Sequence, residues 1–118
     1  MYDVIYILRN NPVHCEELKY SLRSLVNFPH GDVWIAGGIP EKIKPDREFR
    51  VQQHGTSKWA RTTYTLRKIC EAAETPEAFW LFNDDFFVLQ KITDMEPVYN
   101  GTLRERANEL KHSQNARE

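Results

Sequence analysis

One stretch decides the fold of this chain: Phe79-Trp80-Leu81-Phe82-Asn83-Asp84-Asp85-Phe86-Phe87-Val88-Leu89. It predicts a buried strand, a polar break of three residues and a second apolar run. Two adjacent carboxylates among aromatic side chains are costly unless their charge is offset. A divalent cation such as Mg²⁺ or Mn²⁺ that also binds a phosphorylated ligand would offset it. The alternative is a turn in which the side chains of Asn83, Asp84 and Asp85 bond the local backbone.

The rest of the chain alternates strand and helix signals. Strands are predicted over residues 3–8, 32–36, 48–52, 78–82 and 86–90, the last two being the apolar runs that flank the polar break. One helix is predicted to begin near Pro12 and to stop at Pro29, and it buries Leu18, Leu22, Leu25 and Val26. A second is predicted over residues 58–73; we expect Thr65 on its solvent side and its buried side to consist of Trp59, Leu66, Ile69, Cys70 and Ala73. This order predicts an α/β fold with a mostly parallel central sheet flanked by helices. The prediction is a single domain over residues 1–118, with a charged C-terminal helix from about residue 102.

The bulk composition narrows the class of protein. With a formal net charge of −1, the chain has no basic field that would favour nucleic acid as a partner. No stretch approaches the ~20 apolar residues of a membrane span. The N-terminus carries an early acid and too short an apolar run for a signal peptide. We therefore expect a cytoplasmic protein in which Cys15 and Cys70 are reduced packing residues.

Polar groups directly follow three of the predicted strands. They are Arg9, Asn10 and Asn11 after the first strand, Gly37 and Gly38 after the second, and Asn83, Asp84 and Asp85 after the strand at 78–82. Ligands of open parallel sheets bind beyond the carboxyl ends of the strands, so these groups are predicted to share one cleft. Lys58 and Arg61, at the start of a helix, are expected to lean over the same edge.

Such a cleft suits a diphosphate bridged by a metal ion. Arg offers phosphate a planar fork of donors and Lys offers a compact charge. Asn10 and Asn11 can hydrogen-bond a base or a ribose, and Gly37-Gly38 lets the backbone approach a ligand closely. Each residue also has a plainer interpretation: a solvated strand end for Arg9, a turn for the two glycines, and a solvated helix face for Lys58 and Arg61.

Two motifs carry a resemblance to a known family. The ending Asn83-Asp84-Asp85-Phe86-Phe87 resembles the metal-binding aspartate motif (Asp-x-Asp and its variants) of GT-A glycosyltransferases. The run Glu17-Leu18-Lys19-Tyr20-Ser21-Leu22-Arg23-Ser24-Leu25, after Arg9-Asn10-Asn11, is similar to Stealth-type sugar-phosphate transferases and to small phage and bacterial glycosyltransferases. The resemblance covers residues 3 to 90 and implies a nucleotide-sugar-binding half in a minimal or truncated form of the fold.

The resemblance also implies roles for single residues. Arg9, Asn10 and Asn11 would meet the nucleotide, and Asp85 would be the metal ligand with Asp84 beside it. Asn83 stands where many GT-A enzymes have an acid, which leaves its contact to ribose or metal open. For Lys58 and Arg61, contact with the diphosphate or the donor sugar is inferred from their expected place at the same edge of the sheet more than from the resemblance.

The expected function is a metal-dependent glycosyltransferase for hexosyl transfer. It would use Mn²⁺ or Mg²⁺ and a nucleotide-diphosphate sugar, with a UDP-sugar favoured, and would pass the sugar to an unknown acceptor. A variant would transfer sugar phosphate. The alternative is a non-catalytic nucleotide-binding or interaction domain that retains the fold.

Overall fold

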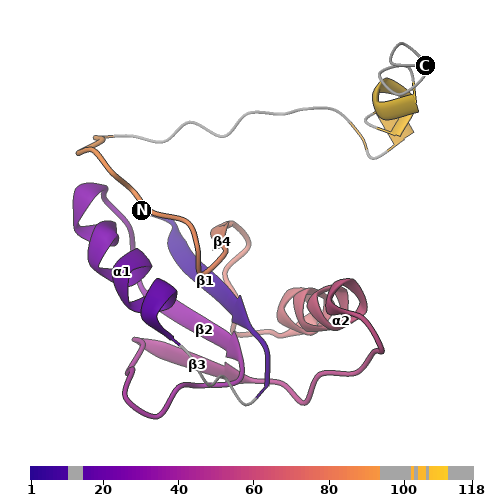
Figure 1. Ribbon diagram of the computed structural model, residues 1–118, viewed down its shortest axis with the longest axis horizontal. Coiled ribbons are helices and arrows are strands. Elements are labelled where there is room, and N and C mark those ends of the chain that lie inside the picture. Colours follow the sequence, from indigo (N-terminus) through magenta and orange to yellow (C-terminus); the bar gives the residue numbers. More distant parts are fainter. Residues whose placement is uncertain (11–14, 94–101, 103, 106, 112–118) are drawn as a thin grey trace.

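The sheet is parallel throughout. The computed structural model describes residues 1–10, 15–93, 102, 104–105 and 107–111. Its strands are β1 (Asp3–Leu8), β2 (Val33–Gly37), β3 (Arg47–Arg50) and β4 (Phe79–Phe82), and they form one four-stranded sheet in the order β3-β2-β1-β4 (Figure 1). All three strand pairs are parallel. The predicted α/β fold with a parallel central sheet is confirmed.

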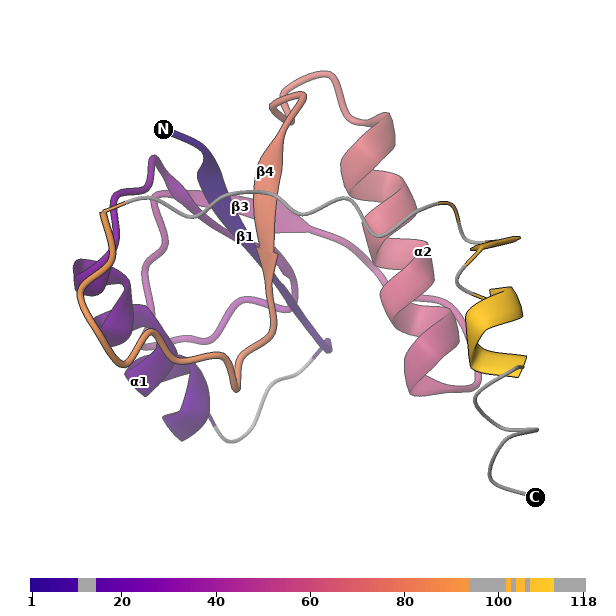
Figure 2. The same ribbon diagram turned by 90° about the horizontal axis from the view of Figure 1, so that it is seen from above.

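One helix covers each face of the sheet. Helix α1 (Glu16–Ser24) continues as a short 3₁₀ segment, η1 (Leu25–Asn27), and α2 is Lys58–Glu71. Figure 2 shows α1 and α2 on opposite sides of the strands. The two faces follow from the alternation of side chains along a strand. From β1, Val4, Tyr6 and Leu8 enter the core with α1, whereas Ile5 and Ile7 belong to the core with α2. Each fully buried aliphatic side chain contributes about 1.5–3 kcal/mol through its removal from water.

The buried faces of the two helices differ from the prediction at five positions. Ala73, predicted on the buried side of the second helix, is exposed and lies beyond Glu71, the last residue of α2. Val26 is 83% exposed rather than buried, because the helix tightens to 3₁₀ at Leu25 and the angular spacing of its side chains changes. Trp59 is 81% exposed and Cys70 is exposed, whereas Thr65, expected on the solvent side, is fully buried. Helix α2 therefore meets the sheet through a stripe centred on Thr65 and Ile69.

The strand predicted over residues 86–90 is wrong. After β4 the backbone makes a turn, in which the Phe86 N–H donates to the Asn83 carbonyl over 3.1 Å, and the chain then leaves the sheet. Its polar backbone groups bond α1 and η1 instead of a neighbouring strand: the Val88 N–H donates to Ser24 Oγ at 3.0 Å, and the Val88 carbonyl accepts from Asn27 Nδ2 at 2.5 Å. An apolar run cannot reveal from its own pattern that its backbone partners are helix side chains.

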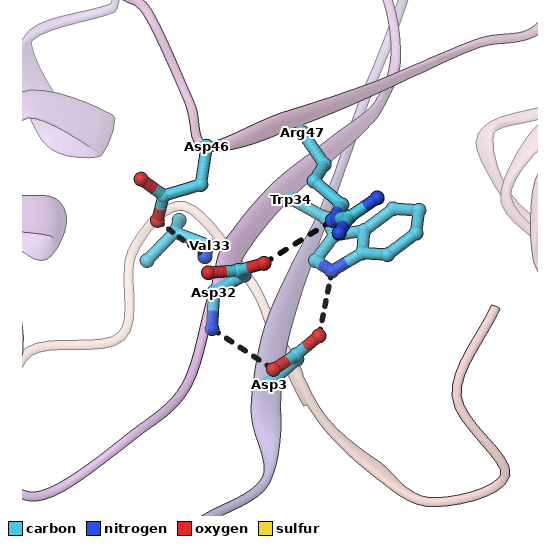
Figure 3. A network of polar contacts seen from close by, with 6 residues as sticks. All are labelled: Asp3, Asp32, Val33, Trp34, Asp46 and Arg47. Carbon is cyan, nitrogen blue, oxygen red and sulfur yellow. Dashed lines mark hydrogen bonds and ion pairs between the residues drawn. The ribbon is translucent and has the colours of Figure 1, made fainter. Parts of the chain in front are cut away.

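A polar network joins the amino ends of three strands, at the end of the sheet opposite the predicted cleft (Figure 3). The Asp3 carboxylate accepts from the Asp32 N–H and from Trp34 Nε1, both at 2.9 Å. Arg47 donates to Asp32 at 3.1 Å and lies over the Trp34 ring. The starts of β1, β2 and β3 are thereby tied together in register, at the end away from the predicted cleft.

The C-terminal helix is described in part. Residues 104–105 and 107–111 are helical, and Thr102 and Glu105 form a capping box with N···O distances of 3.0 and 3.2 Å. Over the residues that the structure describes, no helix has the length and apolar character needed to cross a bilayer.

Candidate functional site

The strand order creates a crevice between β1 and β4. The chain adds β2 and β3 on one side of β1, and then crosses through α2 to place β4 on the other side. Open α/β sheets bind ligands beyond the carboxyl ends of their strands at such a reversal. Here the segments that follow β1 and β4 both lead to the α1 face of the sheet, whereas α2 covers the other face. A cavity of about 360 Å³ lies at this place. It is lined by Ile7, Leu8, Arg9, Cys15, Leu18, Gln53, Lys58, Arg61, Thr62 and Asp84.

The charged groups of this cavity are mostly cationic. Arg9 follows β1, Lys58 and Arg61 come from the first turn of α2, and Asp84 follows β4. Within the described part of the chain, none of these four side chains forms a hydrogen bond or an ion pair. The start of α2 adds the partial positive charge of a helix N-terminus. The excess of unpaired positive charge favours an anionic ligand.

The local sequence explains why α2 begins at the cavity. Ser57 is extended and its Oγ accepts from the Ala60 N–H at 3.1 Å, which is the bonding of an N-cap. Gly55, just before it, has a φ of +135° and lies so close to Ala60 that a Cβ would come within 2.6 Å of the Ala60 Cβ. This turn brings the first turn of the helix, with Lys58 and Arg61, to the carboxyl end of the sheet.

The structure separates the two adjacent acids. Asp84 lines the cationic cavity, whereas Asp85 lines a different, apolar hollow beside β4 together with Trp80 and Phe86. Asn83 is exposed and its carbonyl closes the turn. A turn is present at this motif, but it is closed by backbone atoms, and among the hydrogen bonds of the described residues none joins the side chain of Asn83, Asp84 or Asp85 to the local backbone. The turn therefore leaves Asp84 available to line the cavity.

The protein side chains available as ligands limit the kind of metal ion that can bind in the cavity. Across the described ranges, no group of three or more His, Cys, Asp or Glu side chains is arranged to hold a metal. Among the described residues that line the cavity, Asp84 alone supplies a carboxylate. This fits a hard cation that takes its other ligands from phosphate oxygens and water, as Mg²⁺ commonly does. It does not fit a metal held by protein side chains alone.

Asn10 is engaged by the backbone that follows β3. Its Oδ1 accepts from the Gln53 N–H at 2.8 Å, and its Nδ2 donates to the Val51 carbonyl at 2.7 Å. The amide predicted to meet a base or a ribose therefore joins the ends of two strands. Asn11 lies outside the described residues.

The two glycines line a second hollow, which shares no lining residue with the first. This cavity, of about 590 Å³, is lined by Asn10, Gly37, Gly38, Ile39, Pro40, Glu41, Arg50, Val51 and Gln52. Gly37 has a φ of +107°, and a Cβ at this position would come within 2.0 Å of the Leu8 carbonyl oxygen. The glycine is thus required by the close approach of β1 and by its own backbone angle.

The two motifs of the family resemblance are in direct contact. Ser21 of α1 is fully buried; its hydroxyl donates to the Phe86 carbonyl and accepts from the Tyr6 hydroxyl over 2.7 Å. Burial raises the pKa of Tyr6 above its ordinary value, against the smaller effect of the Ser21 hydrogen bond. The same segment is bonded twice more: Ser24 Oγ accepts from the Val88 N–H, and Asn27 Nδ2 donates to the Val88 carbonyl. The serines of the helix motif therefore hold the segment that carries the aspartates.

Sequence reasoning missed Gln53 and Thr62 in the cavity wall and Thr65 behind it. Gln53 follows a short, weakly patterned edge strand, so no local signal marked it; the rule that placed Arg9 and Asp84, applied to the end of β3, would have pointed to it.

The fold and cavity define a class: a parallel α/β domain with a cationic pocket at its switch point. No protein-family model, no curated protein and no solved structure matches this chain. Its function is therefore argued from the site.

Proposed function

We propose that the protein binds a nucleotide-diphosphate sugar at the switch point and acts as a metal-dependent glycosyltransferase. One observation carries this proposal: Arg9, Lys58 and Arg61 line the same cavity as Asp84, and none of them has an ion-pair partner in the described part of the chain. The resemblance of the two motifs to GT-A and Stealth-type transferases supports the same class of ligand.

Each charged side chain of the cavity has a role in the proposed reaction. Arg9 and Arg61 donate to the phosphate oxygens through their guanidinium forks, and Lys58 adds a compact charge. Once ordered on the diphosphate, these cations would stabilise the negative charge that develops on a leaving nucleoside diphosphate. Asp84 would hold the Mn²⁺ or Mg²⁺ together with that diphosphate. Such an ion, when bound, supplies further stabilisation of the leaving group.

The nucleoside is assigned to the second cavity. Asn10, which lines this hollow, is the chain neighbour of Arg9, which lines the first cavity, and this adjacency supports a ligand that reaches both. Gly37 and Gly38 present backbone there without a side chain. Transfer of sugar phosphate in place of sugar would use the same donor site.

A non-catalytic nucleotide-binding domain is the second candidate, and one observation favours it. Of the residues that the structure describes, Asp84 is the single one to bring a carboxylate to the wall of the cationic cavity. If Asp84 holds the metal, it is not free to act as a general base toward an acceptor.

Calorimetry with UDP, GDP and CDP, each with and without Mn²⁺, tests the donor site. We expect at least one of them to bind more tightly with the metal than without it. Binding to none of the three under either condition would refute the proposed function. Release of nucleoside diphosphate from a sugar donor then separates the enzyme from the binding domain, which would leave the donor intact.

The two cysteines give a second measure of binding. Cys15 lines the cationic cavity, whereas Cys70 is exposed on α2 and does not line it. A bound nucleoside diphosphate should slow the alkylation of Cys15 and leave that of Cys70 unchanged. Equal slowing at both thiols would indicate a general change in the protein and would count against occupancy of this cavity.

A further inference from the structure

The Gln53 side chain holds the backbone on both sides of Arg9. Its Oε1 accepts from the Asn10 N–H at 2.9 Å, and its Nε2 donates to the Leu8 carbonyl at 2.8 Å. Leu8 and Asn10 are the two chain neighbours of Arg9. The position of the arginine is thus set by an amide that comes from the end of another strand.

The same amide also reaches the helix that carries Arg61. Gln53 Nε2 donates its second hydrogen to Thr65 Oγ1 at 2.9 Å, and the Thr65 hydroxyl donates to the Arg61 carbonyl at 2.9 Å. Thr65 is fully buried and does not line the cavity. One side chain therefore connects the backbone positions of two cations that come from β1 and α2.

A glycine makes this connection possible. Gln53 follows β3, which is separated from β1 by β2 in the sheet. To reach the Leu8 carbonyl, the amide passes the end of β2 at Gly37, where a Cβ would come within 2.9 Å of Gln53 Nε2. The bare backbone of Gly37 leaves the space that the amide occupies.

We propose that Gln53 is a positioning residue that fixes the spacing of Arg9 and Arg61, and that this spacing makes the site select two linked phosphates over one. The inference rests on the proposed function, because it assumes that these cations bind phosphate. A single phosphate can be held by either cation alone. A diphosphate that spans both gains affinity only when the two are held at the matching separation, since otherwise their ordering opposes binding.

The test compares inorganic pyrophosphate with inorganic phosphate as probes, by calorimetry at one fixed salt concentration. The variants are Gln53→Met, which keeps the length of the side chain without its amide, and Thr65→Val, which keeps the shape of a buried residue. Gln90→Met serves as the control, because Gln90 is exposed and lines neither cavity. Melting curves establish that each variant is folded.

We expect the wild type and Gln90→Met to prefer pyrophosphate. In Gln53→Met that preference should fall by about tenfold, the scale of one side chain that must be ordered on binding. Thr65→Val should lower it in the same direction but by less, since only the link to Arg61 is lost. Both Nε2 hydrogens of Gln53 are engaged, by the Leu8 carbonyl and by Thr65 Oγ1, so the amide has no donor left for a direct contact with an anion. A smaller folded fraction would weaken both probes equally.

The outcomes separate the two proposals. A wild type that prefers pyrophosphate, with an unchanged preference in Gln53→Met, would overturn the role of Gln53 and leave the proposed function standing. A wild type that binds neither probe would overturn both.

Discussion

The buried hydroxyl of Ser21 is expected to be one of the most sensitive single groups in the protein. Ser21→Ala removes the acceptor of the Tyr6 hydroxyl and the donor to the Phe86 carbonyl. Tyr6 and Ser21 are both fully buried, so water cannot easily replace the lost group. The carbonyl belongs to the exposed Phe86, which allows some rehydration there.

The magnitude follows from these two partners. A buried polar group left without a hydrogen bond costs about 1–3 kcal/mol, and we place the Tyr6 hydroxyl in this range and the Phe86 carbonyl near its lower limit. The expected loss is therefore about 2–4 kcal/mol, a large share of the ~5–15 kcal/mol by which a domain is typically stable. Tyr6→Phe should cost only about 1 kcal/mol, because Ser21 keeps its bond to Phe86.

Urea denaturation followed by far-UV circular dichroism and tryptophan fluorescence measures these losses. The double variant Tyr6→Phe/Ser21→Ala provides the control, since removal of both hydroxyls leaves no orphaned tyrosine. Its loss should be smaller than the sum of the two single losses. A Ser21→Ala protein within about 0.5 kcal/mol of the wild type, the usual range of a surface substitution, would refute the reasoning.

Three further predictions concern the backbone, the pH and the acids. Gly37→Ala should cost about 2–4 kcal/mol in urea denaturation, because of its φ of +107° and the Leu8 carbonyl oxygen in its way, whereas Gly38→Ala, without a positive φ, should cost far less. Burial raises the pKa of Tyr6 above 10.0, so the folded protein keeps this proton longer than the unfolded chain does. The contribution of this pKa shift to stability is complete below pH 10.0 and is lost as the pH rises through the higher pKa of the folded state. Above pH 10.0 the unfolding free energy of Tyr6→Phe should therefore decline less steeply with pH than that of the wild type. Parallel pH dependences of the two proteins would contradict this. Asp84→Asn should abolish the gain in nucleoside diphosphate affinity that Mn²⁺ provides, with Asp85→Asn as its matched control; a loss in Asp85→Asn instead would assign the metal to Asp85, as the family resemblance implies.

The strands were predictable wherever a local pattern was sufficient. The apolar runs at β1 and β2 are largely buried, and the alternation of helix and strand signals indicated parallel pairing. The prediction that the strand before the aspartates is buried is wrong in part: β4 lies at the edge of the sheet, where Leu81 is exposed and only Phe82 is buried. The run at 86–90 has a similar composition, but its backbone partners are Ser24 and Asn27, more than sixty residues away in the chain. Long-range bonds of this kind leave no periodic trace in the segment that receives them.

Part of the site was also predictable. The rule that ligands meet the carboxyl ends of parallel strands indicated that Arg9, Arg61 and Asp84 lie together, and the structure places all three on one cavity. The rule does not give the direction of a side chain, so it could not separate Asp84 from Asp85. Nor could it show that Asn10 and Gln53 bond each other, because that requires the order of the strands and the missing side chain at Gly37.

The two ends of the strands are held together by different kinds of interaction. Carboxylates and the Arg47 guanidinium join the strand starts, whereas the cavity end is fastened by the neutral groups of Asn10, Gln53 and Thr65. Dissolved ions screen exposed charges and have little effect on neutral dipoles. Added sodium chloride should therefore lower the affinity of the pocket for an anionic ligand without changing the shape of the pocket. Ionic strength can then be used to vary ligand binding separately from the structure of the site.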